Sequence, residues 1–379
     1  MENKNLNPYR IMIWQWWRSL DQQLLIAVSI LIGISLLLVT TTSSSVASRI
    51  GAVDNFFAIR HLLYVSLSVV LIIFFSCLDV SSIKKLMLVL FLFNIALLVF
   101  VQFYGFEVKG ARRWINILGF SLQPSEFIKP TFSIFTSLVF TNLLNRNVSF
   151  LLSAVVFLFI AILLISQPDL GMLITLTGIW GVQLFIAGLP IIWIVSVVIL
   201  FFIGMIVAYE YLPHVTARID NFLDPGASEN YQVSQSLSAF KHGGFFGTGP
   251  GEGTVKHNIP DSHADFIFAV AGEEFGAIMC MFISALFAFI VLRSILSLIK
   301  QNNEFVILAA SGIVAQLAIQ SIINMCVSLN LLPTKGMTLP FISYGGSSTL
   351  SVGMEIGIIL AFSKLKVTRA KYNIFKEIK

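Results

Sequence analysis

The chain has 379 residues, of which 57% are hydrophobic and only 11% are charged, and its mean hydropathy is +0.89. These values exclude every class of soluble globular protein and are typical of a polytopic membrane protein. The sequence pI is about 9.1, but the basic residues lie at the ends of apolar segments, so membrane topology explains them better than nucleic-acid binding does. The three cysteines, Cys77, Cys280 and Cys326, predict neither a disulfide framework nor a cysteine metal site.

Residues 1–21 form a polar N-terminal segment without a cleavable signal peptide. Its Trp14, Trp16 and Trp17 beside Arg18 predict an anchor at the membrane interface. Ten apolar segments follow, each long enough to cross a bilayer as a helix. These predicted spans cover residues 22–42, 61–79, 85–104, 126–145, 149–166, 170–188, 190–209, 266–294, 305–330 and 346–364. Lys129 and Pro130 interrupt the fourth span.

The distribution of charge sets the predicted orientation. With the N-terminus inside, 14 of the 24 Lys and Arg residues fall in inside segments and 9 in outside loops, so both termini are predicted to be cytoplasmic. Asp and Glu are distributed the other way, since 13 of the 19 lie in outside segments or at adjoining span ends. We therefore expect an all-α membrane protein. It has one ten-span domain (residues 22–364), a large outer loop between spans seven and eight (residues 210–265) and a basic cytoplasmic tail (residues 365–379).

The loop between spans three and four carries the motif KGARRW, whose Lys109, Arg112 and Arg113 run against the positive-inside tendency. A phosphate-bearing ligand would suit these cations, because Arg presents a planar fork to phosphate oxygens and Lys a point charge. Pairing with lipid phosphates or with loop acids explains them equally well. The motif QPSE follows and places Glu126 at the start of span four.

A sharp break with the sequence QPDLG separates spans five and six. Asp169 stands where an Asp commonly caps the helix that follows, and we expect capping rather than catalysis there. The long outer loop contains HGGFFGTGPGEG, whose glycines either allow close approach to a ligand or simply form turns. It is not a nucleotide motif. Four histidines in this region follow no metal-binding spacing: His214, His242, His257 and His263.

The stretch SHADFIFAVAGEEFG brings acids to the mouth and the inside of an apolar span. Ionisable groups in hydrocarbon are functional-site hypotheses by default, and Asp265 is the foremost candidate. Glu273 and Glu274 lie about two turns deeper and need partners, for which the loop cations or Lys129 are candidates. The alternative is that Asp265 caps a helix and that the glutamates form buried ion pairs.

The last outer segment, LLPTKGMTLPFISYGGSS, is predicted to be a loop or re-entrant segment that enters the final span. Lys335 adds one more outer cation there. A turn anchored by two prolines is the simpler interpretation.

Together these motifs resemble those of the SEDS family, the polytopic peptidoglycan glycosyltransferases of bacterial shape, elongation, division and sporulation. The resemblance covers nearly the whole chain, and KGARRW and LLPTKGMTLPFISYGGSS are more similar to the division subtype than to the elongation subtype. It implies a ten-span fold that polymerises lipid II, an undecaprenyl-pyrophosphate disaccharide-pentapeptide, during septal cell-wall synthesis. One departure is Ala264, where the family often has Thr or Ser before an essential aspartate.

The resemblance gives Asp265 the role of general base, which takes the proton of the acceptor sugar 4-hydroxyl as it attacks the anomeric carbon with inversion. Undecaprenyl pyrophosphate leaves, and its developing charge gives a reason for the outer cations. A divalent cation, Mg or Mn, would help to neutralise the pyrophosphate, but no metal ligands are legible. We expect supporting roles for Asp169, Glu273 and Glu274. Substrate contacts are predicted for Lys109, Arg112, Arg113, Glu126, Lys129, Gln235, Ser238, Lys335 and Ser343.

The division subtype further implies a class B penicillin-binding protein transpeptidase and divisome regulators as partners, beside lipid II and the surrounding membrane lipid. The implied location is the bacterial cytoplasmic (inner) membrane at the division septum. Two alternatives stay open. A lipid II flippase needs substrate-handling groups on both faces, whereas a non-catalytic divisome scaffold does not need Asp265 at all.

Overall fold

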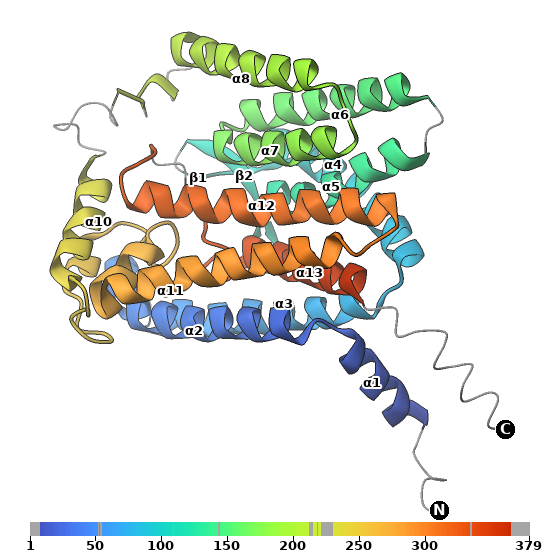
Figure 1. Ribbon diagram of the computed structural model, residues 1–379. Coiled ribbons are helices and arrows are strands. Elements are labelled where there is room, and N and C mark those ends of the chain that lie inside the picture. The colour runs from blue at the N-terminus through green and yellow to red at the C-terminus, as the bar shows by residue number, and fades with distance from the viewer. Residues whose placement is uncertain are drawn as a thin grey trace, which may run out of the picture.

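The computed structural model describes residues 8–51, 53, 55–108, 110–117, 119–142, 145–211, 215–217, 219–220, 230–333 and 336–364. In the described residues, ten long helices overlap the ten predicted spans, with ends that differ by up to eight residues, and run alongside one another (Figure 1). They are α2 (Gln22–Ile50), α3 (Phe56–Cys77), α4 (Val80–Tyr104), α5 (Pro124–Asn142), α6 (Arg146–Ser166), α7 (Leu170–Ile186), α8 (Ile191–Tyr211), α11 (Ile267–Leu298), α12 (Glu304–Ser328) and α13 (Gly346–Ser363).

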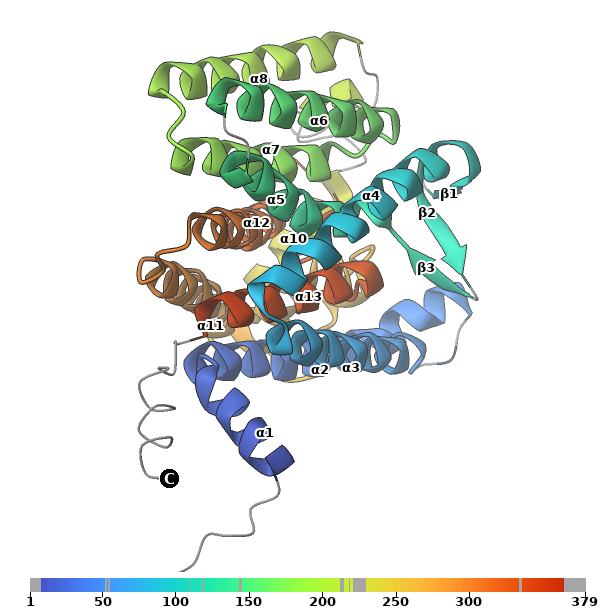
Figure 2. The same cartoon turned by 90° about the vertical axis from the view of Figure 1, so that its right-hand side faces the viewer.

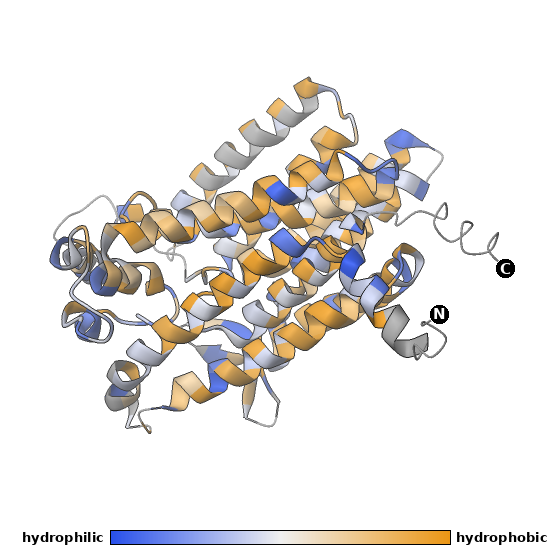
Figure 3. Cartoon of the chain, turned by 60° about the horizontal axis from the view of Figure 1, so that its bottom comes forward, coloured by the Kyte–Doolittle hydropathy of each residue, from blue (hydrophilic) through white to orange (hydrophobic). Residues whose placement is uncertain are grey.

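Within the described residues, seven of these helices are long and apolar enough to cross a membrane by length and composition: α2, α3, α4, α6, α11, α12 and α13. Apolar residues cover most of the helix lengths, and hydrophilic residues gather toward the ends and connections (Figure 3). Large apolar side chains such as Ile162 and Leu292 are exposed on the outer helices, at 64% and 59%. An apolar exterior of this kind is stable only when lipid surrounds it.

Helix α13 lies in the middle of the bundle, and 89% of its residues are buried. Glycines let it approach α3 closely: an added Cβ at Gly353 would lie 2.5 Å from Ser68 Oγ, and one at Gly357 would lie 2.7 Å from Phe75 Cβ. Small residues at a helix contact are typical of membrane bundles, because they bring the backbones together. One hydrophobic core joins α13 to α2, α11 and α12, and a second joins α4, α5, α6 and α7.

Helix α5 continues without a break through Lys129 and Pro130, although the sequence predicted an interruption there. Proline has no backbone N–H, so the carbonyl of Glu126 lacks its usual partner four residues later. Ser351 Oγ on α13 donates a hydrogen bond of 2.8 Å to that carbonyl. The neighbouring helix therefore supplies the bond that Pro130 removes.

A small antiparallel sheet corrects the all-α prediction. Strands β1 (Phe106–Val108), β2 (Ala111–Ile117) and β3 (Phe120–Leu122) lie in the order β1-β2-β3 and project beside α4 (Figure 2). Gly110 and Gly119 turn the chain with φ of 77° and 83°, a backbone region that favours glycine. Strands of three to seven residues carry too little hydrophobic pattern to be predicted beside the long apolar spans.

Shorter helices lie outside the ten in the described part of the chain. Helix α1 (Pro8–Ser19) precedes α2, with Arg18 3.8 Å from the ring centroid of Trp14. Helix α10 (Asn230–Gly243) and the 3-10 helix η1 (Val255–Asn258) occupy the predicted outer loop, and α10 packs against α11. The predicted cytoplasmic tail, residues 365–379, lies outside the described residues.

Candidate functional site

Asp265 lies in a tight turn at the entrance to α11. The backbone N–H groups of Ala264 and Asp265 both donate to Asp261 O, at 2.9 and 3.1 Å. The N-cap residue of α11 is Phe266, which makes no side-chain cap bond, and Asp265 stands directly before it. Its side chain is half-buried.

Two neighbouring elements hold this turn. On α12, Asn324 Nδ2 donates to Asp265 O at 2.9 Å and to Met337 O at 2.6 Å. From the segment before α13, Ser343 Oγ donates to Ala264 O at 2.6 Å. These bonds go to backbone carbonyls, so they fix the position of the turn while leaving the Asp265 carboxylate to other contacts.

The segment of residues 336–345 lies directly beside the carboxylate. Gly336 has a φ of 62°, and a Cβ added there would lie 3.5 Å from Asp265 Oδ2. Tyr344 N donates to His263 O at 2.8 Å, and the rings of these two residues lie 5.2 Å apart. The ring of Phe57 on α3 lies 4.4 Å from the His263 ring and 5.2 Å from the Tyr344 ring, so the three rings pack together. The turn is therefore held between α3, α12 and this segment.

The outer cations and the QPDLG break meet in space. Arg113 Nε donates to Gln167 O at 3.0 Å, and its Nη1 lies 3.7 Å from Asp169 Oδ1. Asp169 also accepts from Met172 N at 3.4 Å, which confirms the predicted cap of α7. Gln123 Nε2 donates to Asp169 Oδ2 at 3.2 Å. This cluster joins the β2 strand to the starts of α5 and α7.

Arg112 and Arg113 thus differ in their surroundings. Arg112 pairs with Glu107 at 3.3 Å, and its side chain is 57% exposed. Arg113 is 16% exposed and braces the turn between α6 and α7. Both arginines therefore pair with acids, the alternative that the sequence left open. Lys109 and Lys335 lie outside the described residues.

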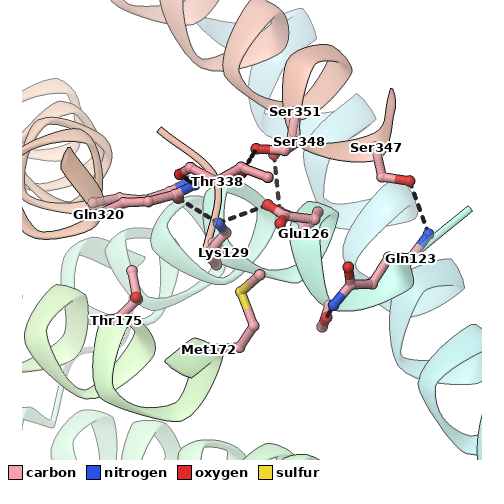
Figure 4. A network of polar contacts seen from close by, with 12 residues as sticks. Gln123, Glu126, Lys129, Met172, Thr175, Gln320, Thr338, Ser347, Ser348 and Ser351 are labelled. Carbon is pink, nitrogen blue, oxygen red and sulfur yellow. Dashed lines mark hydrogen bonds and ion pairs between the residues drawn. The ribbon is translucent and has the colours of Figure 1, made fainter. Parts of the chain in front are cut away.

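A buried polar network occupies the bundle below the outer loops (Figure 4). Lys129 is fully buried, and its Nζ donates to Glu126 Oε2 at 2.8 Å and to Gln320 Oε1 at 2.7 Å. Gln320 Nε2 in turn donates to Thr338 O at 2.9 Å, in the segment that borders Asp265. The charges of Glu126 and Lys129 are satisfied within the protein, and their predicted contact with substrate stays a prediction.

The glycine-rich loop approaches a helix closely. Gly276 interrupts α11 with φ of 74° and ψ of −175°, which frees backbone groups on either side of it. Thr248 N and Gly249 N donate to the carbonyls of Glu273 and Glu274, both at 3.0 Å, while Ala277 N donates to Gly244 O at 3.0 Å. The loop therefore restores the hydrogen bonds that the kink removes. Its glycines serve close approach to α11.

Glu273 and Glu274 are held mainly by η1, the short helix that follows the glycine-rich loop. The Glu273 carboxylate accepts from Val255 N at 2.7 Å and Lys256 N at 2.8 Å, and it lies 3.0 Å from His242 Nδ1. Glu274 pairs with Lys256 Nζ at 2.5 Å, with both side chains buried. The prediction of a loop cation as partner is confirmed for Glu274. The alternative partner Lys129 is wrong, because it pairs with Glu126 three residues earlier on its own helix.

Helix α10 carries the other two predicted substrate-binding residues. Ser238 is exposed and donates to Ser234 O at 2.8 Å, and Gln235 is half-buried. Val233 and Ala239 on the buried face of α10 join a core cluster with Phe266, next to Asp265. Among the described residues, no three His, Cys, Asp or Glu side chains converge in a way that could hold a metal ion.

A row of amide side chains on α12 was not predicted from the sequence. Gln316, Gln320 and Asn324 recur every fourth residue and are all buried, so they share one face of the helix. Gln316 donates to Glu355, the residue on α13 that the sequence analysis also left out. The signal was present, because polar side chains at intervals of four inside an apolar segment point to one partner surface.

Residues 22–367 match the family of FtsW, RodA and SpoVE, described as cell cycle proteins. Among curated relatives, the probable peptidoglycan glycosyltransferase FtsW of Caulobacter vibrioides is 39% identical over 353 residues, 91% of this chain and 90% of the relative. The protein of the same description in Coxiella burnetii is 35% identical over 360 residues, 90% of this chain and 95% of the relative.

Two solved structures share the fold. A chain from the structural study of how a peptidoglycan synthase complex coordinates polymerization and crosslinking aligns with a TM-score of 0.75 at 24% identity. It covers 91% of this chain and 97% of that chain. The rod shape determining protein RodA of Thermus thermophilus aligns with a TM-score of 0.68 at 22% identity, covering 93% and 99%. Both support the helical arrangement described above.

Proposed function

This chain belongs to the FtsW, RodA and SpoVE family of cell cycle proteins, and from that membership we propose that it polymerises lipid II as a peptidoglycan glycosyltransferase. The family predicted from the sequence motifs is confirmed, and the curated relatives bear the name of its division member, FtsW. The activity serves septal cell-wall synthesis during cell division.

The observation that best supports a catalytic site is the way Asp265 is held. Two elements fix the backbone of its turn, α12 through Asn324 and the residue 336–345 segment through Ser343 and Tyr344, and the side chain is only half-buried. A carboxylate on a rigid, multiply bonded turn at the edge of an apolar bundle is a preorganised general base.

The reaction then follows from the chemistry of lipid II. The Asp265 carboxylate accepts the proton of the acceptor sugar 4-hydroxyl as the hydroxyl oxygen forms a bond to the anomeric carbon of the donor. The bond between that carbon and the pyrophosphate oxygen breaks, and its electron pair leaves with the lipid pyrophosphate. Attack on the face opposite the leaving group inverts the configuration at the anomeric carbon.

Charge on the leaving pyrophosphate needs stabilisation. Arg112 is the more accessible of the two described outer arginines, and we assign it the more direct contact with phosphate oxygens. Arg113 acts by bracing the turn at Asp169. A requirement for Mg²⁺ or Mn²⁺ as cofactor stays a prediction. It is tested by removing metal with a chelator, which should abolish activity, and by adding each ion back, which should restore it.

The proposed topology has ten spans with both termini in the cytoplasm of a bacterial inner membrane, concentrated at the division septum. Three segments predicted to be inside meet at one end of the bundle: Leu20 to Gln23, Lys300 to Asn302, and Ser363 with Lys364 line a common pocket. The turns at Asp169 and Asp265 are both predicted to be outside, and neither lines this pocket. Arg113 on β2 contacts the turn at Asp169, and Ser343 in the residue 336–345 segment contacts the turn at Asp265. This separation supports the alternation of spans.

We propose a class B penicillin-binding protein as the transpeptidase partner, with divisome regulators acting on the pair. A polymerase that only lengthens glycan strands requires a second enzyme to crosslink them. The structural neighbour from a peptidoglycan synthase complex supports the pairing of polymerisation with crosslinking in one assembly.

The test is glycan polymerisation from purified lipid II by the reconstituted chain with its cognate penicillin-binding protein, whose own transpeptidase is blocked. Asp265→Asn removes the base without changing shape, and we expect no polymer from it although it folds and binds its partner. Glu252→Gln, an exposed acid of the same outer region, is the matched control and should polymerise normally.

Equal polymer from wild type and Asp265→Asn would rule out this residue as the base. No polymer from either protein would favour the flippase or the scaffold instead. A flippase assay with the same preparation then separates those two.

A further inference from the structure

A pocket of about 430 Å³ opens at the end of the bundle opposite Asp265. It lies where the start of α2, the end of α11, the α11–α12 connection and the end of α13 meet. Its charged lining residues are Asp21, Arg293, Lys300 and Lys364, and amide side chains such as Gln22 and Gln301 complete it. Neither the proposed chemistry nor the predicted substrate contacts use this pocket.

The lining has an excess of positive charge. Asp21, the one acid among the described lining residues, is already engaged: Arg293 Nε lies 2.7 Å from its Oδ2, and Leu24 N donates to its Oδ1 at 3.2 Å. Lys300 is exposed at the mouth of the pocket. Lys364 Nζ has a long bond of 3.4 Å to Leu78 O. Neither ammonium group pairs with an acid of the lining, although the Asp79 carboxylate, outside the lining, acts electrostatically on Lys364.

The start of α2 also favours an anion. Helix α2 begins at Gln22, inside the pocket lining, so the N–H groups of its first turn and the positive end of its dipole lie at this site.

The neighbouring helix α1 indicates the depth of the pocket. Its Trp14 and Trp17 are 55% and 49% exposed, and Arg18 stacks on Trp14. Exposed tryptophans beside a cation are typical of the headgroup layer of a membrane. Helix α1 ends at Ser19, directly before the pocket residues Leu20 and Asp21. The pocket therefore opens at the level where lipid phosphates lie.

We propose that this pocket binds the phosphate of an anionic phospholipid, with Lys300, Lys364 and the first turn of α2 as its ligands. Basic pockets between helix ends on the cytoplasmic side of a membrane protein suit such headgroups. The bound lipid would join α2, α11 and α13 at the end of the bundle remote from Asp265.

The experiment measures lipid retained by the full-length protein in mild detergent, by native mass spectrometry, after addition of phosphatidylglycerol or phosphatidylcholine. We expect wild type to retain phosphatidylglycerol and the Lys300→Gln/Lys364→Gln double variant to bind it about tenfold more weakly. The matched control is Lys84→Gln/Lys85→Gln, which removes two lysines at the same end of the bundle outside the pocket. It should retain phosphatidylglycerol like wild type.

Three results would overturn the proposal: equal retention by the pocket variant, an equal loss in the control variant, or equal retention of phosphatidylcholine by wild type. A thermal-shift series with inorganic phosphate separates the two sources of phosphate. Stabilisation by inorganic phosphate equal to that by phosphatidylglycerol would overturn the lipid and assign a soluble anion. Size-exclusion profiles and the single variants Lys300→Gln and Lys364→Gln ensure that the comparison is between folded proteins.

Discussion

Lys256 and Glu274 form an ion pair whose side chains are 1% and 0% exposed. Removing one partner of such a pair leaves an uncompensated charge in a medium that solvates it poorly. We therefore expect Lys256→Met to lower the free energy of unfolding by about 3–5 kcal/mol. Thermal or denaturant unfolding of the detergent-solubilised protein measures this loss.

The control at the same scale is Lys241→Gln, which removes an exposed lysine near the end of α10. An exposed cation contributes little, and its loss should change stability by less than about 1 kcal/mol. If the two substitutions cost the same, the Lys256–Glu274 pair is not what holds the glycine-rich loop against α11.

Single residues could be predicted where the signal is local. Asp169 was expected to cap a helix because the cap depends only on the residues that follow it, and it does so. The pairing of Arg113 with Asp169 joins positions 56 residues apart, so no pattern along the chain contains it. Lys129 shows the same limit of prediction from sequence. Its acidic partner, Glu126, lies three residues earlier, but its second partner, Gln320, comes from a helix far along the chain.

At the scale of elements, the kink of α11 rests on Gly276. Its φ of 74° with ψ of −175° is a conformation that essentially only glycine adopts, and an added Cβ would lie 2.3 Å from Phe245 O. Gly276→Ala should therefore destabilise the protein by roughly 3 kcal/mol or more, and reduce the yield of folded protein. The melting temperature in detergent measures the effect.

Gly33→Ala is the matched control, because Gly33 lies inside α2 and an added Cβ there meets nothing within 4 Å. Alanine is a better helix former than glycine, so this change should be neutral or stabilise by about 0.5–1 kcal/mol. Tolerance of alanine at both positions would mean that the kink is not required for folding.

Helix α12 positions the turn that carries Asp265, the proposed base, through Asn324, whose amide donates to Asp265 O and Met337 O. Asn324→Ala releases both carbonyls without touching the carboxylate. We expect kcat for lipid II polymerisation to fall about 10- to 100-fold with little change in KM, because the base is displaced while the binding surface persists.

Cys326→Ala tests whether any change on α12 has this effect, since Cys326 is half-buried two residues along the same helix. It should leave kcat and KM unchanged. A rise in KM at constant kcat for Asn324→Ala would assign this residue to substrate binding and remove its positioning role.

The elements themselves were predictable to different degrees. Apolar length alone located all ten long helices, because hydrocarbon forces every backbone group into internal hydrogen bonds. The sheet of β1, β2 and β3 was missed, since its strands are short and rich in polar residues. Helix α10 was also missed, because its amphipathic face is covered by α11, a contact that the sequence does not display.

At the scale of the whole molecule, the two ends of the bundle differ in chemistry. One end holds Asp265, the β2 strand and the glycine-rich loop, and the other holds the cationic pocket and α1. Proposed catalysis and proposed lipid binding are therefore separated by the length of the helices. A polymerase whose substrate and product lie on one side of the membrane needs its catalytic groups at one end of the bundle only.

The orientation of the bundle gives the last prediction. Phe246 in the glycine-rich loop is 79% exposed, and Lys85 is exposed at the opposite end. In a chain whose three cysteines are replaced by alanine, Phe246→Cys should react with a membrane-impermeant maleimide on intact spheroplasts. Lys85→Cys should react only after lysis, because the excess of Lys and Arg holds its loop in the cytoplasm. The opposite labelling pattern would place Asp265 in the cytoplasm, where lipid II polymerisation at the outer face is impossible.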